Sequence, residues 1–385
     1  MKQVFLIVSC ISCLAEVAAQ KPEKIYGNAR QQKPISYYEE QAMAWKKETE
    51  KNPKDPNAWY NFYYVNRNLE FNDTTDKRSS EEKNDFMLTI IENMRKNIPE
   101  SYEYNLCKWM LGGYDMNLLP YLNKAAELGE GRTEHLDYMI CIGELTRKVK
   151  DRDLYSKKKF EAGLFSTGII YYNYNVMMGL EQNAILITSG DNDTYPIWYL
   201  QSLGIRRDIT VINLSLVLID DYRNKLFGEL GINKWPYDWK TKEEYERFNK
   251  GIIKHIAHNS KNLNCYVALT AASCEKFTDS IQEKLFLIGL CYVYSNNTLD
   301  NLALLKKNIE QLYALDYIDK AFYPDISPDM VKLINGNYTI PLFTLFDHYK
   351  LSGDKQKEEW VKSKLLIIAK GANDEKEIIK HLEKP

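Results

Sequence analysis

The sequence predicts an α/β domain, built on a small and mostly parallel sheet, that is flanked by tetratricopeptide-like helical hairpins. Between residues 165 and 296, short apolar runs alternate with helix-like segments, which is typical of parallel strands joined by crossover helices. On both sides of that region, apolar residues recur at helical spacing. The chain has 385 residues, enough for more than one domain with a core of its own.

Residues 1–19 have the pattern of a secretory signal peptide. Lys2 gives a charged start, Val4–Leu14 forms the apolar core, and Val17-Ala18-Ala19 provides a small-residue cleavage site. An alternative stays open, because Ile7-Val8-Ser9-Cys10 resembles a lipobox, which would place a lipid anchor on Cys10. No apolar run is long enough for a transmembrane helix. We therefore expect an exported protein that is periplasmic or associated with the cell envelope.

The next part of the chain predicts helices. Residues 20–34 are polar and unpatterned, as in a linker, and 35–160 has the pattern of an irregular α-helical repeat region. Ser36 and Glu39 have the spacing of a capping box, and Asp55-Pro56 predicts the start of a second helix. The two helices and their proline turn span about 34 residues, the period of a tetratricopeptide repeat. Further helices are expected over 80–97, 101–112, 117–128 and 133–147.

The α/β domain is expected over 165–296, and a helical repeat-like tail over 298–385. In the tail, Ser352-Gly353-Asp354 predicts the turn of a second helical hairpin, and the charged end from Lys370 predicts a solvated helix. Within the α/β domain, helices are expected over 165–180, 195–203, 217–229 and 242–258, and strands over 184–189, 208–214, 265–270 and 285–294.

Composition argues against several classes of function. The formal net charge is −2 and no basic patch stands out, so we expect no nucleic-acid partner. No zinc, P-loop, dinucleotide or hydrolase motif lies at a strand–helix junction, so we expect no cofactor. His255 and His258 lack a third ligand nearby and predict a solvated helix face. Five widely spaced cysteines follow the signal peptide and predict buried free thiols, although one disulfide stays open: Cys107, Cys141, Cys265, Cys274 and Cys291.

The segment Gly190–Thr194 is the best candidate for a functional site. It follows the first expected strand, and parallel α/β sheets keep their ligands at the carboxyl ends of strands. Asp191 and Asp193 have three possible roles. Both could satisfy amides at the start of the following helix, they could hold a divalent cation, or one of them could act as a general acid or base.

Other polar and aromatic residues could line a binding crevice with these carboxylates. Asn213 and Ser215 lie at the end of the second expected strand, which would place them beside the first strand if the two are adjacent and parallel. Satisfied buried polar groups would explain them equally well. The remaining crevice candidates follow the first strand and enter the next helix: Asn192, Thr194, Tyr195 and Trp198.

Several motifs of this region resemble one family. Gly190–Pro196, Trp198-Tyr199 and Val211–Leu216 look like the soluble C-terminal region of a bacterial membrane-protein family that is related to protein O-mannosyltransferases and carries a domain of unknown function. The family's proposed transfer site belongs to its membrane-spanning half, so the resemblance implies an exported, stand-alone accessory domain and carries over no catalytic residue. Asp221 stands where the family tends to have Trp, which removes one family aromatic contact.

These observations together predict an exported cell-envelope accessory protein that is not an enzyme. It would bind protein or glycan partners through its helical-repeat and α/β surfaces. The alternative is a divalent-metal-dependent enzyme that acts on a sugar phosphate or glycan at the Asp191/Asp193 turn.

Overall fold

The computed structural model describes residues 21–237, 241–260, 263–274, 279–320, 324–370, 372 and 374–383. The predicted signal peptide, and Cys10 with it, lies outside the described residues. The chain divides into two compact units. The first unit runs up to Asn28 and continues over 32–130, and the second contains 29–31 and 131–385.

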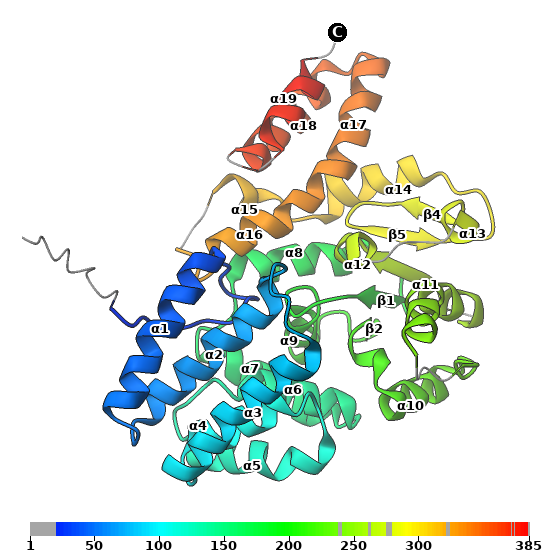
Figure 1. Ribbon diagram of the computed structural model, residues 1–385. Coiled ribbons are helices and arrows are strands. Elements are labelled where there is room, and N and C mark those ends of the chain that lie inside the picture. Colours follow the sequence, from blue (N-terminus) through cyan, green and yellow to red (C-terminus); the bar gives the residue numbers. More distant parts are fainter. Residues whose placement is uncertain are drawn as a thin grey trace, which may run out of the picture. The chain divides into compact units, whose positions relative to one another are not determined.

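The first unit is helical, as the sequence predicts (Figure 1). Its core includes Ile25, Tyr38, Trp45, Ala58 and Val65, all buried. Each of the expected helices is present. The helices are α1 (Ile35–Lys51), α2 (Pro56–Asn72), α3 (Ser80–Asn97), α4 (Tyr102–Leu111) and α5 (Leu119–Leu128), the last preceded by a 3-10 turn at Met116–Leu118.

Helix starts in this unit are set by local chemistry. The carboxylate of Asp55 accepts a hydrogen bond from the Asn57 amide and Pro56 opens α2, which confirms the predicted cap. The capping box predicted at Ser36 is wrong. Pro34 is the N-cap of α1 and no side chain caps that helix, because the proline already holds φ at −57° and starts the helix one residue before Ser36.

The second unit holds the sheet. Its order is β2–β1–β3–β5–β4, with β1 parallel to β2 and β3, and β5 antiparallel to β3 and β4. The predicted fold class is confirmed: a small sheet with a parallel core stands within a mostly helical chain (Figure 1). The elements up to β5 are α6 (Leu136–Leu145), α7 (Val149–Glu161), α8 (Thr167–Met178), β1 (Ile185–Thr188), α9 (Tyr195–Ser202), β2 (Thr210–Asn213), α10 (Asp220–Leu230), α11 (Lys242–Asn259), β3 (Cys265–Ala268), α12 (Leu269–Cys274), α13 (Asp279–Gln282), β4 (Leu285–Leu287) and β5 (Cys291–Tyr294).

The apolar run 285–294, expected as one strand, is a hairpin of β4 and β5. Gly289 turns the chain with φ at +138°, a conformation that a side chain would strain. A Cβ at Gly289 would also lie 2.3 Å from the hydroxyl oxygen of Tyr313. The Leu290 amide donates to that hydroxyl at 3.1 Å, so the tyrosine holds the turn.

The tail forms a second helical hairpin, as predicted. Gly353 ends α17 in the left-handed conformation, and Asp354 caps α18 by accepting from the Lys357 amide. The last helix is present too, but Ile378 and Leu382 are buried, so it is not fully solvated. The described part of the tail contains α14 (Asn301–Lys307), a π-helical turn at Asn308–Leu312, α15 (Asp316–Asp319), α16 (Pro328–Asn335), a 3-10 turn at Gly336–Tyr338, α17 (Thr339–Ser352), α18 (Lys355–Ala369) and α19 (Glu375–Leu382).

The described cysteines are buried free thiols, as expected: Cys107, Cys141, Cys265 and Cys291. Burial raises the pKa of the Cys265 thiol to about 12, so it behaves as a small apolar side chain. The side chain of Cys274 lies outside the described part of the chain. Over the ranges that the structure describes, no helix combines the length and the apolar character needed to cross a bilayer.

Exchanging two glycines for alanine tests the closest helix packing in the second unit. A Cβ on Gly143 in α6 would lie 2.5 Å from the backbone nitrogen of Arg152 in α7 and 2.7 Å from its Cα, so the two helices would have to separate. We expect Gly143→Ala to lower the free energy of unfolding by about 1–3 kcal/mol in urea titrations.

Gly228 in α10 is the matched control, because a Cβ there would meet no atom within 4 Å. Gly228→Ala should raise stability by about 0.5–1 kcal/mol, since alanine loses less backbone entropy in a helix. Equal effects of the two substitutions would contradict the close contact of α6 with α7.

Candidate functional site

The parallel strands β1, β2 and β3 end at one edge of the sheet, and polar side chains follow each of them there. Thr188 ends β1 opposite Asn213, which ends β2. Thr270 lies two residues beyond the end of β3. Side chains that are far apart in the sequence therefore meet at this edge, which we call the carboxyl edge.

Asp193 is the centre of the carboxyl edge and is only 3% exposed. One of its carboxylate oxygens accepts from the Ser189 amide at 2.9 Å and from the Thr270 hydroxyl at 2.5 Å. The other accepts from the Gly190 amide at 2.7 Å and from the Thr194 hydroxyl at 3.3 Å. Burial raises the pKa of Asp193, and these hydrogen bonds act in the opposite direction. Four donors satisfy the acceptor positions of a buried carboxylate.

The capping hypothesis expected Asp193 to accept from backbone amides at the start of α9. Asp193 does accept from backbone amides, but they are not those of α9. Its bonds go back to Ser189 and Gly190, which follow β1. Helix α9 begins after Thr194, which makes no side-chain cap, and Pro196 occupies its first turn as expected. The backbone carbonyl of Asp191 closes the turn by accepting from the Tyr195 amide at 3.0 Å. The side chain of Asp191 is exposed, so the two carboxylates stand in different environments.

Thr194 and Asn213 are brought together with this turn. The Thr194 hydroxyl lies 2.7 Å from the Thr188 hydroxyl and accepts from the Asn213 side-chain amide at 2.9 Å. Asn213 in turn accepts from the Ser215 amide, and the Ser215 hydroxyl donates to the Ser189 carbonyl at 3.2 Å. These crevice candidates therefore bond one another and the turn in a continuous network.

The other crevice candidates have different surroundings. Tyr195 is buried with its hydroxyl 2.7 Å from the Cys141 sulfur, and its ring stacks on Trp198 at 5.5 Å. Trp198 is fully buried below the Arg152 guanidinium. Asn192 is half-buried, and its side-chain amide donates to the Ala29 carbonyl at 2.9 Å. The two aromatic residues thus pack toward α6 and α7.

The sequence interpretation missed Thr188 and Thr270. Both follow from the argument that identified Asn213, because parallel strands end at one edge. Applying it to the end of the third expected strand would have selected Thr270, the partner that ties Asp193 to β3.

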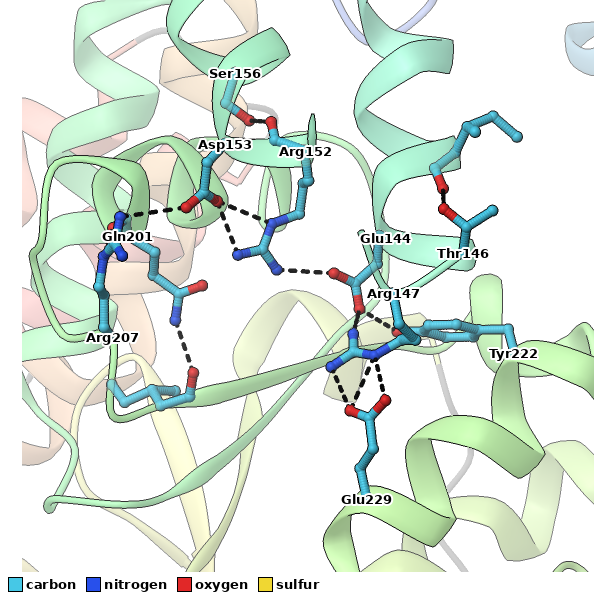
Figure 2. Close-up of polar contacts among 12 residues, drawn as sticks. Glu144, Thr146, Arg147, Arg152, Asp153, Ser156, Gln201, Arg207, Tyr222 and Glu229 are labelled. Carbon is cyan, nitrogen blue, oxygen red and sulfur yellow. Dashed lines mark hydrogen bonds and ion pairs between the residues drawn. The ribbon is translucent and has the colours of Figure 1, made fainter. Parts of the chain in front are cut away.

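A second polar centre surrounds Glu144 in α6 (Figure 2). Glu144 is 1% exposed and accepts from Arg147, from Arg152 at 2.8 Å and from the Tyr222 hydroxyl at 2.8 Å. Burial and the neighbouring carboxylate of Glu144 hold the pKa of Tyr222 well above its usual range. The network of charged side chains extends outward to Glu229, whose carboxylate pairs with Arg147 near the surface. This centre joins α6, α7 and α10, and its partners are all supplied by the protein.

Neither centre has the composition of a metal site. Among the described residues, no three His, Cys, Asp or Glu side chains come close enough to hold one ion. His255 lies 2.7 Å from the Asn233 carbonyl and stacks with Phe227, so it is held in place by packing. His258 is exposed and lies against the ring of Tyr294.

Comparison with known proteins supports the resemblance in the sheet region. Residues 170–300 match the family model described as TMEM260-associated domain 2, and TMEM260 is an O-mannosyltransferase family. The match contains the five strands found in the described residues, together with the carboxyl edge. It covers about a third of the chain. No curated protein matches the sequence.

Asparagine substitutions at the two aspartates test their different roles. Asp193→Asn keeps the size of the side chain but turns an amide group toward donors that now lack an acceptor. We expect a loss of about 2–3 kcal/mol of unfolding free energy. Asp191→Asn, at the exposed position, should change stability by less than about 0.5 kcal/mol. Similar losses from both variants in the same urea titration would contradict this assignment.

Glutamine substitutions test the Glu144 centre. Glu144→Gln removes the fully buried carboxylate partner of Arg152 and leaves Asp153 as its remaining counter-charge, so we expect a loss of about 3 kcal/mol in thermal or urea unfolding. The control is Glu229→Gln, which removes a carboxylate that is about half exposed from the same network. That variant should lose less than about 1 kcal/mol, because solvent screens the pair. A small effect of Glu144→Gln would mean that the buried charges are not coupled as described.

Proposed function

We propose that this chain is an exported accessory protein of the cell envelope that catalyses no reaction and binds protein or glycan partners. The signal-peptide pattern of residues 1–19 supports export. The match of residues 170–300 to a domain associated with an O-mannosyltransferase family supports a link to envelope glycoproteins.

The bonding of Asp193 is the observation that carries this proposal. A general base must direct a free lone pair at the proton that it removes, and a metal ligand must direct one at the ion. Asp193 directs its oxygens at four donors of its own domain. Asp191 is exposed, and among the described residues it belongs to no group of three His, Cys, Asp or Glu side chains that could hold a metal ion. The arrangement favours a rigid scaffold over a reaction centre.

The helical parts supply surfaces for a partner. Hairpins α1–α2 and α17–α18 resemble single tetratricopeptide units, and stacked units of that kind bind peptides and proteins on their concave surfaces. Each of the two units therefore carries one hairpin of a type that is used for binding.

A binding assay with a chemical readout tests the proposal. Residues 20–385 would be immobilised and exposed to cell-envelope extract of the source organism and to a glycan array. We expect a partner well above background whose mass is unchanged after incubation, because the protein binds it without modifying it. Asp191→Asn should recover the same amount of that partner.

Metal titration separates the enzyme alternative. Calorimetry with Mg²⁺, Mn²⁺ and Ca²⁺ should give no saturable heat for the wild-type chain. A metal-dependent change in the mass of the partner that disappears in Asp191→Asn would favour the enzyme. Recovery of no partner would count against the binding role itself.

A further inference from the structure

Residues 21–28, expected to belong to a linker, lie as an extended segment along the α1–α2 hairpin of the first unit. Gln41 of α1 holds the backbone of this segment from both sides. Its carbonyl oxygen accepts from the Glu23 amide at 2.8 Å, and its nitrogen donates to the Lys21 carbonyl at 3.4 Å. The Trp45 indole donates to the Glu23 carbonyl at 2.8 Å. Helix α1 therefore binds the peptide groups of Lys21 and Glu23 through two of its side chains.

Helix α2 continues the same recognition. The side-chain oxygen of Asn61 accepts from the Ile25 amide at 2.9 Å, and the Asn68 nitrogen donates to the Tyr26 carbonyl at 2.9 Å. Gln41, Asn61 and Asn68 are all buried. Burying three amide side chains is costly unless each finds partners, and an extended peptide supplies them at regular intervals.

Ile25 is the one buried side chain among residues 21–28. Ile25 is 3% exposed and packs in the core with Tyr38, Trp45, Ala58 and Val65. Lys24, the preceding residue, is exposed. Ile25 is therefore the apolar anchor of the segment.

The positions on either side of the anchor are also selected. The Tyr37 hydroxyl donates to the Glu23 carboxylate at 3.1 Å. A Cβ on Gly27 would lie 2.8 Å from the hydroxyl oxygen of Tyr64, the far end of a side chain that can shift, so glycine is preferred there but not required. The hairpin thus favours the pattern Glu-x-Ile-x-Gly over residues 23–27, with the strongest selection at Ile25.

One buried acceptor is left over. Within the ranges that the structure describes, the side-chain oxygen of Asn68 is buried and has no hydrogen-bond partner. An unmet buried acceptor costs about 1–3 kcal/mol. Residues 21–28 pair with the side-chain nitrogen of Asn68 but leave its oxygen unpaired. A peptide that also offers an N–H to this oxygen would therefore bind more tightly than the chain's own segment.

We infer that the α1–α2 hairpin is a peptide-binding groove for an extended segment of a partner protein that carries Glu-x-Ile-x-Gly or a close variant. Residues 21–28 occupy the groove in cis and are displaced by the partner. Signal cleavage before Gln20 would leave Lys21 next to a free terminus, so the segment can peel away without opening a loop. The inference rests on the proposed binding role and names one partner class for it.

Fluorescence anisotropy with the full mature chain tests the groove. The probe is a labelled synthetic peptide of residues 20–31. In the wild-type chain the tethered segment competes at an effective concentration in the millimolar range, so the probe should bind weakly. Ile25→Ala in the protein weakens that competitor, and we expect the native-sequence probe to bind this variant at least about tenfold more tightly.

Matched probes and a groove variant define the specificity. A probe with Ile25→Asp should not bind, and a probe with Lys24→Ala should bind like the native sequence, because Lys24 faces solvent. Adding Asn61→Leu to the Ile25→Ala protein should reduce affinity by about tenfold, through loss of one buried hydrogen bond. Equal binding of all probes, or no binding to the Ile25→Ala protein, would overturn the proposal.

Hydrogen exchange on the wild-type chain covers the case in which Ile25→Ala does not fold. The Glu23 and Ile25 amides should exchange through a local opening, well before the central amides of α1 and α2. Exchange of all these amides in one global step would mean that the segment is permanent core, and would also overturn the proposal. Both measurements use purified protein, so their failure is distinguishable from a failed search for partners in envelope extract.

Discussion

The carboxyl edge of the sheet depends on one buried carboxylate. Asp193 lies in the turn after β1, and its bonds hold the first residues of that turn and the hydroxyl of Thr270 after β3. The peptide groups at the end of a central strand have no neighbouring strand to pair with, and an unpaired buried amide is costly. Asp193 satisfies them from within the next few residues. The loop can therefore turn sharply and start α9 with its hydroxyl network in place.

The Glu144 centre also depends on a buried carboxylate, but this one compensates the charge of a buried guanidinium. Helices α6 and α7 approach so closely at Gly143 that Arg152 is carried into the interior. A buried guanidinium requires counter-charge and acceptors, which Glu144 and Asp153 supply together, and Glu144 also accepts from Tyr222 of α10 (Figure 2). The glycine contact and the ion pair are therefore parts of one arrangement, in which close packing creates the need for charge compensation.

The sequence predicted much of this architecture and less of its chemistry. Apolar periodicity and turn residues located the helices and the parallel strands, and the order of strands placed Asn213 beside the turn at Asp193. The hairpin at Gly289 was missed because 285–294 is continuously apolar. Glu144 could not be selected, because its partners are separated from it by up to 78 residues and any helix contains such glutamates. Pairing of distant polar groups follows from tertiary packing, which periodicity does not encode.

The N-terminal segment shows why polar composition is a poor guide to disorder. Residues 21–28 contain one aliphatic side chain and looked unpatterned, since their ordering comes from Gln41, Asn61 and Asn68 on the helices that receive them. These amides bind backbone, so the segment needs no hydrophobic pattern beyond Ile25. Because the groove recognises peptide groups and one apolar anchor, a partner segment that offers both can replace residues 21–28, with further preference set at the positions of Glu23 and Gly27. The contacts that bury residues 21–28 are therefore the same contacts that a displacing partner peptide would make.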